Sequence, residues 1–374
     1  MDITGAVLRE MGAARPYGQS RPIDVVPLRL DPPGEGEVLV RVEVAGLCHS
    51  DLSVIEGNRP RPMPMLLGHE AAGIVEEVGP GVPAHLLGRR VATTFLARCG
   101  ACPECRTGGR LPCREGSATN AAGTLPSGAI RLHEGDRPVH HHLGVSGFAT
   151  HAVLDRRSTV LVDEDVPAAV AALSGCALLT GGGAVVNAAQ LTDSDSLAVV
   201  GLGGVGMAAL LTALAVVGPG GHVVGVDQNP DKLAVARAWG AHEALTPDEA
   251  RERGTRVDVV IEAAGHPRAF ETGLSLLASG GRLVTVGLPA PGATAQVEPL
   301  DITARALSIV GSYQGSAVPE RDIPLLLDLW RAGRLPVERL ATATNSLTEV
   351  HRALDRLASG QAVREMILPG TPAG

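Results

Sequence analysis

The sequence predicts an α/β protein with two domains, one rich in β-strands and one built on a parallel sheet. The chain has 374 residues, which corresponds to two domains at roughly 150 residues each. The first part of the chain consists of short apolar runs separated by Gly/Pro turns, a pattern typical of strands. From residue 195 onward strand-like runs alternate with helix-like runs, which favours a parallel sheet with helices between its strands.

The β-rich part contains three clear strand candidates. Residues 38–44, 72–78 and 90–94 are apolar runs, and Gly/Pro turns at 31–36 and 79–81 separate them. Residues 99–147 are rich in Cys, Gly, Pro and His and show little periodicity. We expect this segment to be a loop region that needs a cross-link to hold it together.

In the second part of the chain, strand-like and helix-like runs alternate as they do in a parallel α/β domain. One helix has clear end signals: Asn229 is its predicted N-cap, Pro230 occupies the first helical position and Gly240 follows its end. Near the C-terminus we expect a helix and then a last strand. The predicted strands and the late helix are residues 196–200, 223–226, 257–261, 282–286 and 362–368, and 347–359.

Charge and hydropathy exclude several classes of function. The formal net charge is −8, so no basic surface for nucleic acid is expected. The N-terminus lacks the apolar core of a signal peptide, and we expect a cytoplasmic protein. Residues 168–190 and 197–217 are uncharged and long enough to cross a bilayer. Glycines interrupt both, so we interpret them as buried segments and expect no membrane association.

Four closely spaced cysteines predict a structural zinc site. Cys99, Cys102, Cys105 and Cys113 form the pattern C-x2-C-x2-C-x7-C. Four thiolates fill every position of a tetrahedral zinc ion, so such a site folds the loop and leaves no position for a substrate. The alternatives are four unrelated cysteines, a disulfide pair or an iron–sulfur cluster.

The other two cysteines, together with one histidine, suggest a second metal site. Cys48 and Cys176 both lie among small residues, and His69 lies between them in the sequence. Two cysteines and one histidine are a ligand set for a catalytic zinc with an open fourth position. On spacing alone this prediction is weak, because a histidine beside Glu70 is also a common structural pair.

A glycine-rich turn predicts a dinucleotide site. Residues 201–206, GLGGVG, match G-x-G-x-x-G, follow a predicted strand and open a helix. The next strand ends at Asp227, whose carboxylate would accept hydrogen bonds from the adenosine ribose and repel a 2′-phosphate, so NAD is favoured over NADP. The alternative is a glycine-rich turn of an ordinary βαβ unit. The predicted cofactor-binding residues here are Gly201, Gly203, Gly204, Val205, Gly206 and Asp227.

Taken together, these motifs resemble those of the zinc-containing alcohol dehydrogenases of the medium-chain dehydrogenase/reductase superfamily, and of their liver-type and class III branch in particular. The resemblance implies a doubly wound Rossmann domain, residues 178–320, inserted in a GroES-like β-rich catalytic domain, residues 1–177 and 321–374. The motifs that carry it are GLCHSD at 46–51, GHEAAG at 68–73, the Cys99–Cys113 lobe, NAAGTL at 120–125, SGCALLTGGGAVVNAA at 174–189, GLGGVG at 201–206 and VRE at 363–365.

The resemblance also implies roles for individual residues. Ser50 binds the substrate oxygen and receives its proton, Asp51 orients His69, and Glu70 lies behind the zinc as a transient ligand. Phe95 is a candidate wall of the substrate pocket. The residues at cofactor-contacting positions of the family are His49 and Arg364 for the pyrophosphate, Thr180 near the nicotinamide, and Lys232, the only lysine of the chain, for the adenosine ribose.

The predicted function is therefore reversible hydride transfer between a primary or secondary alcohol and NAD in an enzyme with two zinc ions per chain. One departure concerns the proton path, since many relatives carry a histidine where this chain has Ser53. The alternatives are a formaldehyde dehydrogenase acting on a thiol adduct, a polyol dehydrogenase, and a non-enzymatic zinc-stapled binding protein. The expected partners are a small alcohol or aldehyde and further copies of the chain, as a homodimer or homotetramer.

Overall fold

The computed structural model describes residues 1–370 and divides into two compact units. Unit 1 comprises Met1–Cys176 and the C-terminal segment from Ala341; unit 2 is Ala177–Leu340. We expected the second boundary at 320/321, whereas the chain returns to unit 1 only at Ala341. The reason is helix α11 (Pro319–Arg331), which packs on α5 (Ala177–Gly183) of unit 2 through an apolar face. That face is formed by Ile323, Leu326 and Leu327.

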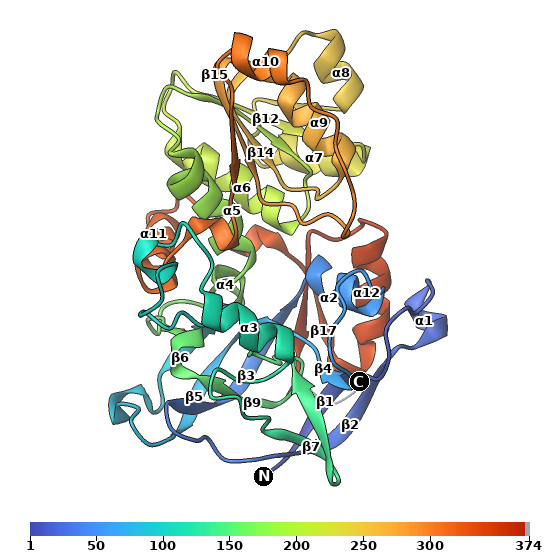
Figure 1. Ribbon diagram of the computed structural model, residues 1–374, viewed down its shortest axis with the longest axis vertical. Helices are drawn as coiled ribbons and strands as arrows, with labels where there is room; N and C mark the ends of the chain where they lie inside the picture. The colour runs from blue at the N-terminus through green and yellow to red at the C-terminus, as the bar shows by residue number, and fades with distance from the viewer. Residues whose placement is uncertain (371–374) are drawn as a thin grey trace. The chain divides into compact units, whose positions relative to one another are not determined.

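Unit 1 is built from a small closed barrel and a larger sheet (Figure 1). The barrel has the strand order β1-β2-β7-β8-β4, and the sheet has the order β10-β6-β5-β3-β18-β17, with β9 also paired to β3. The barrel strands are β1 (Asp2–Leu8), β2 (Ile23–Leu30), β4 (Met65–Leu66), β7 (Leu132–Glu134) and β8 (Arg137–His141). The sheet strands are β3 (Glu37–Leu47), β5 (Glu70–Val78), β6 (Arg90–Thr93), β9 (His151–Asp155), β10 (Thr159–Leu161), β17 (Ala341–Ser346) and β18 (Arg364–Leu368).

The pairing of β3 with β5 brings distant parts of the sequence together. The two strands are antiparallel, and Gly46 near the end of β3 lies opposite Glu70 at the start of β5. Cys48 directly follows β3, and His69 directly precedes β5. Both residues therefore lie at the same end of this strand pair. Helix α4 (Ala168–Ser174) packs on this sheet and ends at Gly175. A Cβ on Gly175 would lie 1.8 Å from the carbonyl oxygen of Thr93, so glycine permits the close approach.

The segment 99–147, expected to be a loop region, contains regular structure. Helix α3 (Arg114–Ala122) begins at Cys113, whose sulfur accepts from the backbone N–H of Gly116, and ends at Gly123 with φ +69°. Strands β7 and β8 follow as a hairpin. The helix was missed because its sequence contains few apolar residues and its N-cap is a cysteine, which is not a common capping residue.

Unit 2 contains a six-stranded sheet of order β13-β12-β11-β14-β15-β16, in which every neighbouring pair is parallel. The chain winds outward in both directions from β11, so the sheet is doubly wound. Its strands are β11 (Ser196–Val200), β12 (His222–Val226), β13 (Glu243–Leu245), β14 (Val257–Glu262), β15 (Leu277–Thr285) and β16 (Ser308–Gly311). Helices α6 (Gly204–Val216), α7 (Pro230–Ala238), α8 (Pro247–Glu252), α9 (Pro267–Ser275) and α10 (Pro299–Ala304) alternate with them.

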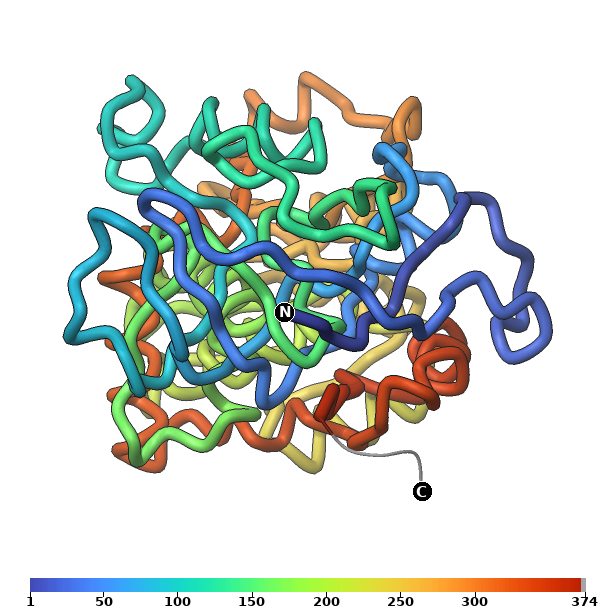
Figure 2. The backbone as a smooth tube through the Cα atoms, turned by 90° about the horizontal axis from the view of Figure 1, so that it is seen from below, coloured from blue at the N-terminus to red at the C-terminus, as the bar shows by residue number. Residues whose placement is uncertain are grey.

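The C-terminal segment completes unit 1. Strand β18 inserts between β3 and β17, and helix α12 (Val350–Ala358) lies beside α1 (Tyr17–Ser20) in both views (Figures 1 and 2). There Asp355 accepts hydrogen bonds from the backbone N–H groups of Tyr17 and Gly18 at 2.6 and 2.8 Å. A short helix, α2 (His49–Ile55), completes the elements of unit 1 that surround Cys48.

Within residues 1–370 no single helix is both long and apolar enough to cross a membrane. One bent pair of helices, Ala168–Ser174 and Ala177–Ala189, has the necessary length and composition.

Candidate functional site

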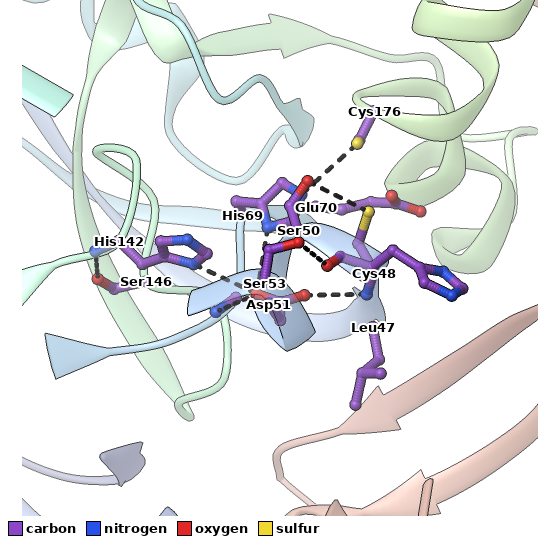
Figure 3. A network of polar contacts seen from close by, with 12 residues as sticks. Leu47, Cys48, Ser50, Asp51, Ser53, His69, Glu70, His142, Ser146 and Cys176 are labelled. Carbon is purple, nitrogen blue, oxygen red and sulfur yellow. Dashed lines mark hydrogen bonds and ion pairs between the residues drawn. The ribbon is translucent and has the colours of Figure 1, made fainter. Parts of the chain in front are cut away.

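Three predicted metal ligands meet in unit 1 (Figure 3). The ligand atoms of Cys48, His69 and Cys176 all lie within 4.8 Å of one another, and the three residues are 6%, 1% and 4% exposed. The Cys176 sulfur is 3.6 Å from His69 Nε2. Two sulfurs and one imidazole nitrogen at this separation form a donor set that fits zinc, and three protein ligands leave a coordination position for a substrate.

Asp51 fixes two of these ligands through the first turn of α2. Its Oδ2 accepts a hydrogen bond from the backbone N–H of Cys48 at 2.9 Å, which forms a capping box at the start of the helix. Its Oδ1 lies 3.2 Å from Nδ1 of His69. A carboxylate bound to Nδ1 sets the tautomer that leaves Nε2 free for a metal. This contact would allow Asp51 to orient His69.

A second histidine, which was not predicted from the sequence, reaches the same carboxylate. Nδ1 of His142 lies 3.2 Å from Asp51 Oδ1, and the His69 and His142 rings meet edge to face with centroids 5.2 Å apart. The loop that holds His142 is tightly bent, because Leu143 and Ser146 both have positive φ and Ser146 Oγ accepts from the His142 backbone N–H. Three consecutive histidines, 140–142, were the available signal. The sequence does not show which of them faces inward.

Glu70 and Arg364 form a buried pair beside the thiols. Arg364 Nη2 lies 3.4 Å from Glu70 Oε2, and both residues are at most 1% exposed. Both carboxylate oxygens of Glu70 lack a hydrogen-bond partner among the described residues. A Cβ on Gly46 would lie 2.5 Å from Glu70 Oε1, so only glycine leaves room for this carboxylate. A buried carboxylate that makes no hydrogen bond and lies beside a thiol pair suits a position behind a metal ion.

The electrostatics of this site favour cation binding. A hydrogen bond from Cys176 lowers the pKa of the Cys48 thiol well below its usual range, although burial opposes this. Burial raises the pKa of Glu70 to about 7, against the attraction of Arg364. Burial lowers the pKa of His69, but the charge of Asp51 outweighs it and raises that pKa to about 10. Since a metal ligand must be deprotonated, protons compete with the metal for His69.

The predicted substrate-side residues lie around these ligands. The hydroxyl of Ser50 is 3.8 Å from the Cys48 sulfur. Ser53 Oγ donates to the carbonyl of His49 at 2.9 Å, one helical turn earlier. The ring of Phe95 meets that of His69 edge to face at 5.8 Å. The positions of Ser50 and Phe95 are compatible with a hydroxyl-bearing substrate beside His69.

The four cysteines of the 99–113 lobe also converge. Their sulfurs lie within 4.8 Å of one another, and all six cysteines of the chain are free thiols. The Cys99 sulfur accepts from the Cys102 backbone N–H at 3.3 Å, which lowers the pKa of Cys99 to about 6. Backbone N–H groups directed at sulfur stabilise thiolates. Four converging sulfurs that already accept backbone hydrogen bonds fit a closed zinc site.

Three glycines of the glycine-rich turn in unit 2 have different structural roles. Gly201 has φ +94°, and a Cβ there would lie 2.6 Å from the Ala264 nitrogen. A Cβ on Gly206 would lie 1.8 Å from the Gly201 carbonyl oxygen, so α6 packs closely on the turn. A Cβ on Gly203 would meet nothing within 4 Å. The open side at Gly203, next to Gly204 and Val205 at the start of α6, fits a phosphate group approaching the backbone.

Asp227 and Lys232 lie beside this turn. Asp227 Oδ2 accepts from the backbone N–H of Leu202 at 2.7 Å, and Lys232 Nζ is 3.9 Å from the same oxygen. Thr180 is in α5 of unit 2 and is 8% exposed. The predicted pyrophosphate contacts His49, exposed at the start of α2, and Arg364, buried in β18, both belong to unit 1.

Comparison with known proteins agrees with both units. The Alcohol dehydrogenase GroES-like domain matches residues 34–164, and the Zinc-binding dehydrogenase domain matches residues 204–331. An Escherichia coli S-(hydroxymethyl)glutathione dehydrogenase is 30% identical over 95% of this chain and 98% of its own.

Two solved structures resemble the whole chain. An alcohol dehydrogenase zinc-binding domain protein from Burkholderia ambifaria has a TM-score of 0.90 at 33% identity and covers 99% of both chains. The benzyl alcohol dehydrogenase of Acinetobacter calcoaceticus has a TM-score of 0.89 at 30% identity, covering 98% of this chain and 99% of its own. With its GroES-like and Rossmann domains, the chain therefore belongs to the zinc-dependent alcohol dehydrogenases of the medium-chain dehydrogenase/reductase superfamily.

Proposed function

We propose that this oxidoreductase uses NAD to oxidise a primary or secondary alcohol, and reduces the corresponding aldehyde or ketone, with two zinc ions per chain. The observation that carries the proposal is the buried donor set of Cys48, His69 and Cys176 with the Ser50 hydroxyl beside it. The lobe of four cysteines, 99–113, would hold the second zinc.

Each residue around the donor set of Cys48, His69 and Cys176 has a separate role in alcohol oxidation. Zinc, when bound, supplies Lewis acidity that favours loss of the hydroxyl proton. Asp51 keeps His69 in the ligating tautomer. Ser50 would accept the substrate's hydroxyl proton at Oγ while it passes its own hydroxyl proton on, and Phe95 would form a wall of the pocket. No imidazole stands at position 53, and the hydroxyl of Ser53 cannot hold a proton near neutral pH, so the proton must leave through water or another base.

The cofactor preference depends on the glycine-rich turn and Asp227. A bound NAD would supply the acceptor for the hydride of the substrate carbon. Gly203 leaves room for its pyrophosphate, and Asp227 would accept hydrogen bonds from the ribose hydroxyls and repel a 2′-phosphate. Lys232, His49, Thr180 and Arg364 are the further contacts we assign to NAD.

A screen of NAD⁺ reduction at 340 nm tests the proposal. Benzylic alcohols come first, because a 30% identical structure is a benzyl alcohol dehydrogenase; aliphatic alcohols and polyols follow. Formaldehyde with and without glutathione tests the second candidate, which the S-(hydroxymethyl)glutathione dehydrogenase relative favours. Cys176→Ser is the control and should lose turnover in every arm. Absence of NAD⁺ reduction in all arms of a zinc-replete preparation would contradict the proposal.

We also propose that the protein is a homo-oligomer, a dimer or a tetramer. Strand β16 is the outermost strand of the parallel sheet, and Ser308, Ile309 and Gly311 are exposed on it. Leu300, in α10, is 71% exposed. An open strand edge that carries an exposed apolar side chain, Ile309, suits pairing with a second copy. Light scattering coupled to gel filtration measures the assembly, and a monomer at micromolar concentration would contradict this proposal.

A further inference from the structure

Two rings meet the His69 ring edge to face in unit 1. Phe95 does so with centroids 5.8 Å apart and an interplanar angle of 85°, and His142 with centroids 5.2 Å apart at 81°. The two residues come from separate segments, one after β6 and one in the loop after β8. Helix α3 lies between these segments in the sequence and is hydrogen-bonded to both of them. It can therefore fix both rings relative to His69.

Asn120 on α3 holds the segment that carries Phe95. It is 7% exposed, and its Nδ2 donates to the carbonyl of Phe95 at 2.7 Å. One turn earlier on the same face, a Cβ on Gly116 would lie 2.2 Å from the carbonyl oxygen of Ala97, so the helix packs closely on this segment. Gly116 and Asn120 are the buried residues of α3. The buried face of the helix is therefore the face that supports Phe95.

The C-terminal end of α3 holds the segment that precedes His142. Gly123 ends the helix, and its carbonyl accepts a hydrogen bond from the backbone N–H of His141 at 2.8 Å. A Cβ on Gly123 would lie 3.0 Å from the Cβ of His140, so this end of the helix is in close contact with the end of β8. One helix thus supports both of the rings that contact His69.

The order of α3 depends on its contacts with the rest of unit 1. The helix has nine residues, and isolated helices shorter than about 12–15 residues are marginal in water. At its N-terminus the Cys113 sulfur accepts from the backbone N–H groups of Gly116 and Cys99, both at 3.4 Å. Since Cys113 belongs to the four-cysteine lobe, α3 is fixed at one end by the lobe and along its buried face by Asn120.

We infer that Asn120 is a positioning residue for the substrate side of the candidate zinc site, and that it acts by holding the Phe95 ring against His69. The inference rests on the proposed function, in which Phe95 forms a wall of the alcohol pocket. Without the amide of Asn120 the Phe95 carbonyl loses this donor, and a buried carbonyl without a donor costs free energy unless its segment moves. Such a movement would displace the ring and loosen the wall of the pocket.

Steady-state kinetics of Asn120→Ala with two alcohols tests this role. Alanine has the highest helix propensity, so α3 itself should persist in the variant. We expect the KM for benzyl alcohol to rise about fivefold, the effect of roughly one net hydrogen bond. Ethanol has no ring to pack on Phe95, so its KM should stay within about twofold of the wild-type value, as should kcat for both alcohols.

Two further variants separate positioning from a general effect on stability. Thr119→Val is the matched control, because the Thr119 hydroxyl donates to carbonyls within α3, those of Glu115 and Gly116. It should keep both wild-type KM values. In a Phe95→Ala background Asn120→Ala should have little further effect on benzyl alcohol, since the ring that Asn120 positions is then missing. An equal effect of Asn120→Ala with and without the Phe95 ring would overturn the inference.

Hydrogen–deuterium exchange of the zinc-replete protein is a second measurement that needs neither substrate nor turnover. In Asn120→Ala the backbone amides of residues 94–98 should exchange several-fold faster than in the wild type, because this segment has lost its support. The amides of unit 2 should exchange at the wild-type rate. Thr119→Val should match the wild type in both regions.

The outcomes separate this inference from the proposed function. If the wild type oxidises neither alcohol with NAD⁺, the proposed function fails for these substrates, and the exchange of residues 94–98 alone decides whether Asn120 holds this segment. If the wild type oxidises both alcohols, an equal rise of both KM values in Asn120→Ala, or no rise in either, would overturn the inference. Unchanged exchange at residues 94–98 in Asn120→Ala would overturn it as well.

Discussion

One carboxylate, Asp51, links three parts of the candidate metal site. Through Oδ2 it holds the backbone of Cys48, and through Oδ1 it contacts both His69 and His142. It is fully buried, and although burial raises the pKa of Asp51, the charge of His69 and the contact with His142 lower it below its usual range. The carboxylate therefore stays charged throughout the range in which the enzyme would work.

Replacing Asp51 by asparagine should loosen zinc binding at Cys48, His69 and Cys176. We expect affinity to fall about 10- to 100-fold, the usual effect of losing a carboxylate that orients a histidine ligand. Competition with a chromophoric chelator measures it. Asp31→Asn is the control, because Asp31 also pairs with a histidine, His133 at 2.8 Å, elsewhere in unit 1. Equal zinc retention in both variants would refute the orienting role.

The buried His141 should make stability depend on pH. Burial lowers its pKa from 6.5 to about 3 in the folded protein. The unfolded chain therefore binds the extra proton first, so the His141 contribution is complete above pH 6.5 and is lost as the pH falls toward 3. The slope is at most about 1.4 kcal/mol per pH unit.

Urea denaturation between pH 7 and pH 4 checks this dependence. His141→Gln keeps an acceptor for the backbone N–H of Arg131, which Nε2 of His141 binds at 3.1 Å, and should show a flatter pH dependence than the wild type. The exposed His85→Gln serves as the control. Parallel curves for His141→Gln and the wild type would mean that His141 is protonated in the folded state or contributes nothing.

The three candidate zinc ligands could be predicted from the sequence, but the residues that contact them could not. The sequence identified Cys48, His69 and Cys176 as a possible set because few residue types bind zinc. Their convergence depends on the register of β3 and β5, which no local pattern specifies. His142 escaped prediction because its role depends on a bent loop with positive φ at Leu143 and Ser146.

At the scale of the elements, the 99–113 lobe is an irregular segment whose order depends on four sulfurs. Cys105→Ser should remove one ligand and lower the melting temperature and solubility, because a structural zinc contributes folding free energy directly. Cys176→Ser should abolish turnover with a much smaller effect on stability. Differential scanning fluorimetry and activity assays on both variants measure this contrast. If Cys105→Ser changed only activity, the two sites would be reversed.

Elements with strong local signals were predictable. The β3, β5 and β6 regions and helix α7, whose Asn229 cap accepts from the Asp231 backbone N–H at 2.9 Å, follow the apolar runs and end signals. Helix α3 lacks an apolar stripe, so its formation depends on Cys113 and the lobe rather than on periodicity. The later unit boundary depends on α11 packing against α5, a contact between segments far apart in sequence.

For the molecule as a whole, the zinc content follows from the two ligand clusters. Purified protein should contain two zinc ions per chain by mass spectrometry of the metal. Cys105→Ser and Cys176→Ser should each retain about one, since each removes a ligand from only one cluster. A wild-type content of one zinc per chain, after dialysis into zinc-replete buffer, would contradict the assignment of two sites.

Cofactor choice should change at a single side chain of unit 2. Asp227→Gly removes both the ribose hydrogen bonds and the repulsion of a 2′-phosphate, so the ratio of kcat/KM for NAD⁺ to that for NADP⁺ should fall by at least about tenfold. Steady-state kinetics with both cofactors measures the ratio. Asp231→Ala, on the neighbouring turn of α7, is the control and should keep the wild-type ratio. Equal wild-type efficiency with both cofactors would count against the role of Asp227.

The insertion of unit 2 into unit 1 has a consequence for synthesis on the ribosome. Strand β18 is the neighbour of β3 in the sheet, yet more than three hundred residues separate them. At about 5–20 residues per second, β18 leaves the ribosome on the order of 15–60 s after β3. Unit 2 is continuous and is fully translated within that interval. Throughout that interval the end of β3 that pairs with β18, residues 45–47, is an open strand edge with which another chain can pair.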